Sequence, residues 1–315
     1  MDTLLEPLGF AFFQRAMIAS VLVGVVCAVV GSYVVLKGLA FIGDAISHAA
    51  FPGIVAAFIL GGSFYVGAGI AAVSTSVAIT WVSRRGGLRL DTTIGVLFAG
   101  TFALGIFLYS TIEGYVGDLF HLLFGYILGI SPGDLVALTL LGGTVLLVVA
   151  LLWKELLYAT FDPLAAAASG IAVARLEYVF IALVAVTIVV SLQAVGIVLV
   201  VAMLVTPAAT AQLLTSRFSS MMLVAILVAS TSAVAGLYLS FWFDVASGAT
   251  IVLVQTAQFL AALLLGPKSG LLARRRPVPS DKTASVGEAG ATPGVREGTG
   301  VDDLHGQLQG VQVDQ

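Results

Sequence analysis

Long apolar segments separated by short polar loops occupy most of the chain, from residue 15 to residue 266. A helix needs about 20 apolar residues to cross the hydrocarbon core of a bilayer. Nine segments reach or approach that length, and we expect each to be a membrane-spanning helix: 15–36, 40–60, 63–83, 92–110, 133–153, 176–193, 195–214, 219–240 and 247–266. The pattern therefore predicts an all-α, polytopic membrane helix bundle with eight or nine transmembrane helices.

Some stretches are less regular than the rest. Segment 40–60 contains ionisable residues and a proline, and only a short break around Gly196 separates 176–193 from 195–214. The apolar piece at 119–130 is too short to cross and fits an interfacial or re-entrant segment. These stretches leave the choice between eight and nine helices open.

The composition changes at residue 267. Of the 315 residues, 59% are hydrophobic and 10% are charged, whereas a soluble domain carries about 25% charged residues. This composition excludes a water-soluble enzyme. Twelve of the 31 charged residues lie in 267–315, which is rich in Gly, Pro, Ser and Thr and has too little apolar surface to fold. We expect a transmembrane domain over 1–266 and a disordered cytoplasmic tail over 267–315.

Basic residues mark one side of the membrane. If nine helices alternate in direction, only Arg15 lies opposite the other loop cations, which are Lys37, Arg84, Arg85, Arg89, Lys154, Arg175, Arg217, Lys268, Arg274, Arg275 and Arg276. Cytoplasmic loops carry the excess of Lys and Arg, so we expect the N-terminus outside and the C-terminus in the cytoplasm. The last three arginines are placed to contact anionic membrane lipid. No basic stripe with interleaved aromatic residues indicates a nucleic-acid partner.

Asp44 and His48 are the main ionisable residues inside a predicted span. Such residues are costly in a membrane and suggest function. Four positions apart on a helix, the two side chains share one face, and a carboxylate with an imidazole suits Mn²⁺, Fe²⁺ or Zn²⁺. Small neighbours such as Gly43 and Ser47 let another helix approach closely. Pro52 and the following glycine could unwind the helix beyond the pair.

Two ligands are too few for a tight metal site. A two-fold homodimer would bring two copies of Asp44 and two of His48 around its axis. The alternative is a hydrogen-bonded pair that only ties helices together. The predicted boundaries place Asp44 nearer the cytoplasmic end of its span than the midplane, so either the span is tilted or its boundary lies elsewhere.

Two other positions are weaker candidates. Asp118 and His121, three residues apart, are either a transient cation site at the outer mouth or an ordinary interfacial pair. Pro207 interrupts an apolar span, where it removes a backbone donor and predicts a helix kink.

A short helix is predicted in the loop after the fifth span. Asp162 can cap it, with Pro163 at its first position; an alanine run follows, and Gly170 ends it. Such a helix would lie across the membrane face with a surface of small residues. One interpretation is that this helix inserts into a groove on another protein. The alternative is that it is an ordinary amphipathic connector between two spans.

Catalytic motifs are absent from the sequence. There is no Gly-x-x-x-x-Gly-Lys-Ser/Thr loop for nucleotide binding, no Gly-x-Ser-x-Gly elbow and no His-Glu-x-x-His motif. We therefore expect no ATPase activity from this chain and no permanently bound cofactor.

Over about residues 13–266 the chain resembles the permease subunits of bacterial ABC importers for manganese, zinc and iron. Four motifs carry the resemblance: IGDAISHA at 42–49, LFG at 123–125, FDP at 161–163 followed by Gly170, and VGIVLV at 195–200 leading to TPAATA at 206–211. The tail after residue 267 departs from that family, and we assign it no function.

The resemblance implies a homodimeric permease in the bacterial plasma membrane, with two cytoplasmic ATPase subunits and an extracytoplasmic metal-binding lipoprotein. Asp44 and His48 match the residues that meet the transported metal on the dimer pathway. The segment 161–171 matches the coupling helix that docks on the ATPase, through Phe161, Asp162, Pro163 and Gly170.

The transported ion stays open among manganese, zinc and iron. Zn²⁺ binds more tightly than Mn²⁺ to most sites, but the lack of a thiolate near the pair favours manganese slightly. One alternative is an ABC permease for a metal chelate such as a siderophore or cobalamin, whose path should not need a buried Asp–His pair. The other is a metal transporter or channel that works without an ATPase.

Overall fold

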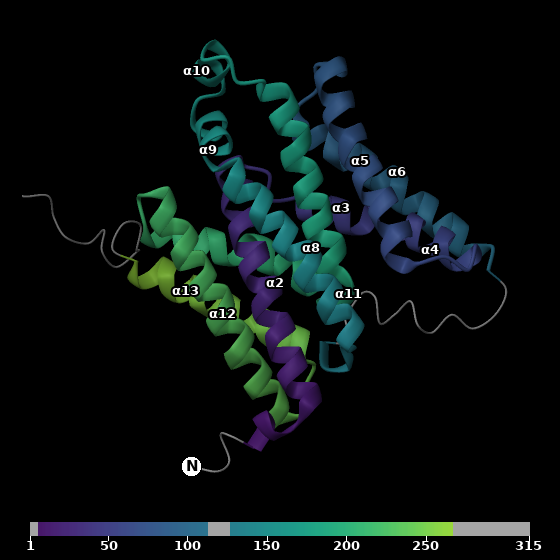
Figure 1. Ribbon diagram of the computed structural model, residues 1–315, viewed down its shortest axis with the longest axis vertical. Coiled ribbons are helices and arrows are strands. Elements are labelled where there is room, and N and C mark those ends of the chain that lie inside the picture. The colour runs from purple at the N-terminus through teal and green to yellow at the C-terminus, as the bar shows by residue number, and fades with distance from the viewer. Residues whose placement is uncertain (1–5, 113–126, 267–315) are drawn as a thin grey trace, which may run out of the picture. The chain divides into compact units, whose positions relative to one another are not determined.

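The described part of the chain is built from helices. The computed structural model describes residues 6–112 and 127–266, and the regular structure in these ranges is helical. Eight helical segments are long and apolar enough to cross a membrane. They are α2 (Ala11–Leu36), α3 with α4 (Ile42–Ile59), α5 (Phe64–Gly86), α6 (Leu90–Ser110), α8 (Pro132–Leu151), α11 (Val173–Leu214), α12 (Phe218–Phe243) and α13 (Ser247–Leu265) (Figure 1).

Shorter elements complete the described chain. They are η1 (Glu6–Gly9), η2 (Ile127–Gly129), α9 (Trp153–Phe161) and α10 (Pro163–Ala168). The helices begin and end close to the predicted boundaries, so the all-α bundle prediction is confirmed. The division between a domain over 1–266 and a tail stays a prediction, because 267–315 lies outside the described residues.

The second span is interrupted but not unwound. It consists of α3 (Ile42–Ala49) and α4 (Phe51–Ile59). Ala50 between them keeps right-handed helical dihedral angles, with φ −68° and ψ −26°. Pro52 has no amide hydrogen to donate to the carbonyl of His48, which interrupts the hydrogen-bond ladder at this point. The predicted unwinding beyond the Asp–His pair is therefore wrong, since the backbone stays helical.

Helix α11 folds back on itself at Gly196. This residue has φ 79° and ψ 166°, a conformation that favours glycine, in the middle of an otherwise helical segment. A straight helix of 42 residues would be about 63 Å long. Yet Phe180, near the start of α11, and Phe218, just after its end, both contact Tyr33, with ring centroids 6.2 and 4.8 Å away. The two predicted spans at 176–193 and 195–214 are therefore the two arms of one hairpin.

Helix α2 lies in the interior of the bundle. Most of its length is buried, and it packs against both α11 and α12. The backbone of α11 approaches so closely that a Cβ atom on Gly31 would overlap with the carbonyl oxygen of Leu204. Helices α3 to α6 pack among themselves and join α2 mainly through α11. The fold therefore positions α3, which carries Asp44 and His48, against α11.

The two ends of the bundle differ in charge. Phe13 near the start of α2 contacts Phe241 near the end of α12, with ring centroids 5.6 Å apart, while the other end of α2 meets the start of α12. All basic residues in the described ranges except Arg15 lie at that second end, with α9 and α10: Lys37, Arg84, Arg85, Arg89, Lys154, Arg175 and Arg217. This agrees with the predicted placement of the loop cations.

We expect Gly31→Ala to destabilise the bundle, because the added methyl group has no space between α2 and α11. Overpacking of this kind costs about 1–3 kcal/mol. The thermal unfolding of the detergent-solubilised protein, followed by size-exclusion chromatography, measures the effect. Gly69→Ala on α5 is the matched control, since its Cβ would meet nothing within 4 Å. Equal unfolding temperatures for the two variants would contradict the close helix contact.

Candidate functional site

Asp44 and His48 contact each other on one face of α3. The Nδ1 atom of His48 lies 2.9 Å from the backbone oxygen of Asp44 and 3.4 Å from its carboxylate Oδ1. The His48 side chain is 20% exposed, whereas that of Asp44 is 47% exposed. The spacing of four residues thus produces the contact that the sequence predicts, and it leaves the carboxylate open to further partners.

The hydrogen bond determines which ring nitrogen of His48 is available. A carbonyl oxygen only accepts, so Nδ1 must carry the proton that it shares with Asp44. In the neutral ring the lone pair is then on Nε2, and a metal-binding histidine commonly donates its other nitrogen in this way. Nε2 is therefore the ring nitrogen that is available to a metal ion.

Two aromatic rings fix the orientation of the imidazole. The His48 ring is edge-on to Phe98 and Phe102 of α6, with ring centroids 5.3 and 5.1 Å away. These residues are eight and twelve positions after Leu90, the first residue of α6, or about 12 and 18 Å along the helix. His48 therefore lies beside the middle of α6, which ends at Ser110. Asp44 is the third residue of its span, Ile42–Ile59, so it lies near the end of that span, as the predicted boundaries have it.

Small residues around the pair allow close packing on α11. Gly43 and Ser47 are buried, and a Cβ atom on Gly43 would come within 2.9 Å of the Leu204 side chain. The Ser47 hydroxyl donates to the carbonyl of Gly43 on its own helix, at 2.7 Å. Within residues 6–112 and 127–266 no group of three or more His, Cys, Asp or Glu side chains is placed to hold a metal ion. One copy of the chain therefore offers two ligands at this position.

The helix predicted around Asp162 forms with the predicted caps. The Asp162 carboxylate accepts a hydrogen bond from the Ala165 amide at 2.9 Å, and Pro163 is the first residue of α10. At the other end, Gly170 has φ 88°, and the amide of Ile171 reaches back to the carbonyl of Ala166 at 3.1 Å. This is a Schellman cap, which requires the left-handed conformation at its glycine position.

Large apolar side chains are exposed where α9 ends and α10 begins. Phe161, the last residue of α9, and Leu164 of α10 are 64% and 83% exposed. Figure 1 shows α10 at one extremity of the bundle, with α9 next to it.

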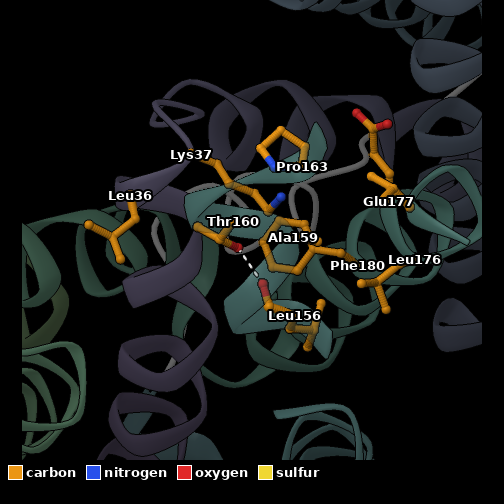
Figure 2. Close-up of a pocket in the computed structure, with 10 residues that line it drawn as sticks. Leu36, Lys37, Leu156, Ala159, Thr160, Pro163, Leu176, Glu177 and Phe180 are labelled. Atoms are coloured by element: carbon orange, nitrogen blue, oxygen red, sulfur yellow. Dashed lines mark hydrogen bonds between the residues drawn. The ribbon is translucent and has the colours of Figure 1, made fainter. Parts of the chain in front are cut away.

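A cavity of about 320 Å³ separates this element from the ends of the long helices. Figure 2 shows its lining, which includes Lys37 after α2, Thr160 of α9, Pro163 of α10 and Phe180 of α11. Glu177 of α11 lies at its edge. Sequence reasoning missed this cavity, since its residues come from three separate stretches of the chain, 36–37, 156–163 and 173–180.

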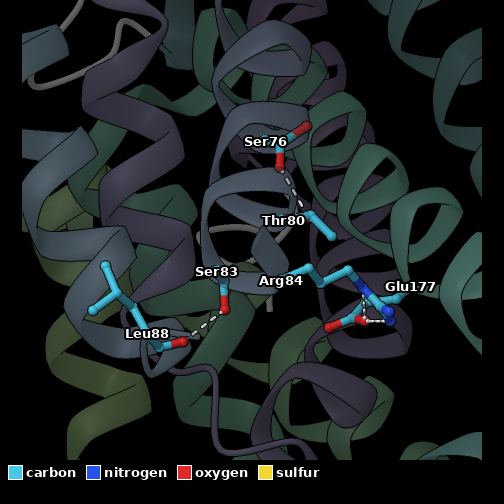
Figure 3. A network of polar contacts seen from close by, with 6 residues as sticks. All are labelled: Ser76, Thr80, Ser83, Arg84, Leu88 and Glu177. Carbon is cyan, nitrogen blue, oxygen red and sulfur yellow. Dashed lines mark hydrogen bonds and ion pairs between the residues drawn. The ribbon is translucent and has the colours of Figure 1, made fainter. Parts of the chain in front are cut away.

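Polar side chains link α5 to α11 at both ends of the bundle, directly at one end and through Asp134 of α8 at the other. At the basic end, Arg84 donates to Glu177 through Nε at 3.1 Å and through a second guanidinium nitrogen (Figure 3). At the other end, Asp134 accepts from Tyr65 and Gln193, each at 3.1 Å. Sequence reasoning missed both networks, because their members are about 60 to 90 residues apart.

Several predicted positions are not tested by the geometry. Asp118, His121 and the motif at 123–125 lie outside the described residues. Pro207 is buried inside α11, and the departure from helical dihedral angles in that helix is at Gly196 instead. A kink at Pro207 therefore stays a prediction.

Known proteins resemble this chain over almost all of the described residues. The family model of the ABC 3 transport family matches residues 9–266. The manganese transport system membrane protein MntC of Halalkalibacterium halodurans is 46% identical, over 85% of this chain and 92% of that protein. The chelated iron transport system membrane protein YfeD of Yersinia pestis is 42% identical, over 82% of this chain and 87% of that protein.

Solved structures have the same fold. The structure of PsaBC from Streptococcus pneumoniae in complex with Fab superposes with a TM-score of 0.76 at 36% identity, over 85% of this chain and 96% of that one. A second structure, described as an inward-facing conformation of a metal-chelate type ABC transporter, superposes with a TM-score of 0.66 at 17% identity. At this identity the similarity shows the fold alone. From the extent of the family match and the identity to its relatives, this chain belongs to the ABC 3 transport family.

Proposed function

We propose that the chain is the membrane permease of an ATP-driven importer for divalent transition-metal ions, with manganese or iron as the cargo. The observation that carries this proposal is the Asp44–His48 pair, which offers oxygen and nitrogen ligands within a membrane span, beside the middle of α6. The names of the similar proteins, which refer to manganese and iron transport, support the choice of cargo.

The metal path is proposed to lie between two copies of the chain. Asp44 is half-exposed in a single copy, and a carboxylate within a membrane span needs a partner. Two-fold pairing would add a second Asp44 and a second His48 and complete a four-ligand site. The free Nε2 of His48 would serve as the nitrogen donor. The ion is a passing substrate, so a site of moderate affinity is suitable.

The basic end of the bundle is proposed to face the cytoplasm. Its seven cations follow the excess of Lys and Arg on that side. This places α10 where a cytoplasmic ATPase subunit would dock, and the start of α2 outside, on the side of a metal-binding lipoprotein. The chain carries no nucleotide-binding loop, so ATP hydrolysis is assigned to the partner.

We expect Asp44→Ala and His48→Ala each to lower metal uptake at least about tenfold. Removing a residue that only hydrogen-bonds to a metal ligand already lowers metal affinity about 10- to 100-fold, and Asp44 and His48 are the proposed ligands themselves. Uptake of radiolabelled Mn²⁺ into metal-starved cells measures this, with co-purification of the ATPase as the test of assembly. Ser47→Ala is the matched control, because its hydroxyl bonds only within α3. Normal uptake by both variants would refute the proposed path.

We expect free Mn²⁺ or Fe²⁺, rather than a chelated ion, to be the form transported. The pair ligates a bare ion directly, whereas a chelate already satisfies the ligand positions of its metal. Uptake of labelled Mn²⁺, measured against excess unlabelled Fe²⁺, Zn²⁺ or ferric siderophore, separates these cases. Competition by the siderophore alone, with no effect of free ions, would favour the metal-chelate alternative.

We expect Asp162→Ala and Gly170→Ala to weaken coupling to the ATPase. Asp162→Ala removes the N-terminal cap of α10, which lowers the stability of the helix by about 0.5–2 kcal/mol. Gly170→Ala forces an alanine into a backbone conformation with φ 88°, which costs about 1–2 kcal/mol of stability. Co-purification with the ATPase and metal-stimulated ATP turnover are the measurements. Asp162→Ser keeps a capping oxygen and should behave as wild type. Unchanged coupling in both alanine variants would remove the docking role from α10.

A further inference from the structure

The cavity beside α9 and α10 contains one cation whose charge has no direct partner. Lys37 extends into it, with its Nζ 5.5 Å from the centroid of the Phe180 ring (Figure 2). Within residues 6–112 and 127–266 its ammonium group makes no hydrogen bond and no ion pair. Burial lowers the pKa of Lys37, and the nearby Glu177 carboxylate opposes part of that effect. The ammonium group is thus poorly hydrated and has room beside it.

The other polar groups of the cavity are already engaged. Glu177 accepts both hydrogen bonds from Arg84, so most of its charge is neutralised. The Thr160 hydroxyl donates to the carbonyl of Leu156 at 2.6 Å. Most of the remaining lining is apolar. An occupant must therefore offer one negative group to Lys37 and apolar or neutral atoms to the rest of the wall.

The position of the cavity suggests where such an occupant comes from. The cavity lies at the end of the bundle that carries seven basic residues. It is beside Leu36, the last residue of α2, and the first turns of α11. In the orientation proposed above, this is the level of the cytoplasmic lipid headgroups, and basic pockets between transmembrane helices on that side bind anionic headgroups. The volume, about 320 Å³, is at the lower end of small-ligand sites, which span about 300–1,000 Å³.

We propose that this cavity is a binding site for the phosphate group of an anionic membrane lipid, paired with Lys37. The phosphodiester supplies the missing negative charge, and the glycerol part lies against Leu156 and Phe180. A lipid held there contacts the end of α2, α9 and the first residue of α10 at once. It would therefore support the element proposed to dock on the ATPase. This inference rests on the proposed orientation of the basic end, and it is independent of which metal is transported.

The test is the retention of lipid by the detergent-purified full chain, measured by native mass spectrometry after incubation with phosphatidylglycerol or phosphatidylcholine. We expect wild type to retain phosphatidylglycerol selectively, and Lys37→Gln to retain about fivefold less, the effect of one basic residue at an anionic surface. Arg85→Gln is the matched control: it is a cation at the same end that stacks on Trp81 and does not line the cavity. Lys37→Arg should restore retention.

A second variant separates loss of binding from loss of folding. Ala159→Leu fills the cavity without touching the charge, and it should also lower phosphatidylglycerol retention. Equal retention by Lys37→Gln, Ala159→Leu and wild type would overturn the proposal. Displacement of the lipid by excess inorganic phosphate would overturn the assignment of the bound phosphate group to a lipid. It would identify a soluble phosphate compound as the ligand instead. Loss of ATPase co-purification in Lys37→Gln, with lipid retention unchanged, would assign Lys37 to the protein partner instead.

Discussion

The contact of Leu204 with two glycines holds together the helices that build the candidate site. Its backbone oxygen lies against Gly31 of α2, and its side chain lies against Gly43 of α3. In a membrane, helices gain little from hydrophobic burial against each other and associate through close packing instead. The returning arm of α11 can therefore rest on α2 and α3 only because both present a residue without a side chain. The position of Asp44 depends on this contact.

The orientation of the imidazole follows from that packing. Helix α3 lies between α11 and α6, and the ring of His48 meets Phe98 and Phe102 at its edges. Its Nδ1 is occupied by the backbone of Asp44. A side chain so constrained has one free nitrogen and little freedom to turn. The half-exposed carboxylate beside it explains why the proposed path needs a second copy of the chain.

The sequence was informative where signals are local. Apolar runs predicted the spans, the cap residues predicted α10 with its Asp162 and Gly170 ends, and the spacing of Asp44 and His48 predicted their contact. The contacts of His48 with Phe98 and Phe102 were not foreseen, because they depend on which residues of α6 lie opposite. The Arg84–Glu177 ion pair and the Lys37 cavity were not foreseen for a similar reason. Each joins residues far apart in the chain, and single-sequence patterns carry no information on such pairs.

The reversal at Gly196 has a consequence for the whole C-terminal third of the chain. Because α11 begins and ends at the same face of the bundle, the helices of the described ranges, 6–112 and 127–266, run from face to face an odd rather than an even number of times. If α11 were one straight helix instead of a hairpin, α12 and α13 would each run in the opposite direction through the bundle. A single residue that tolerates φ 79° thus sets the parity of the topology. That parity puts the end of α13 on the face where α10 lies.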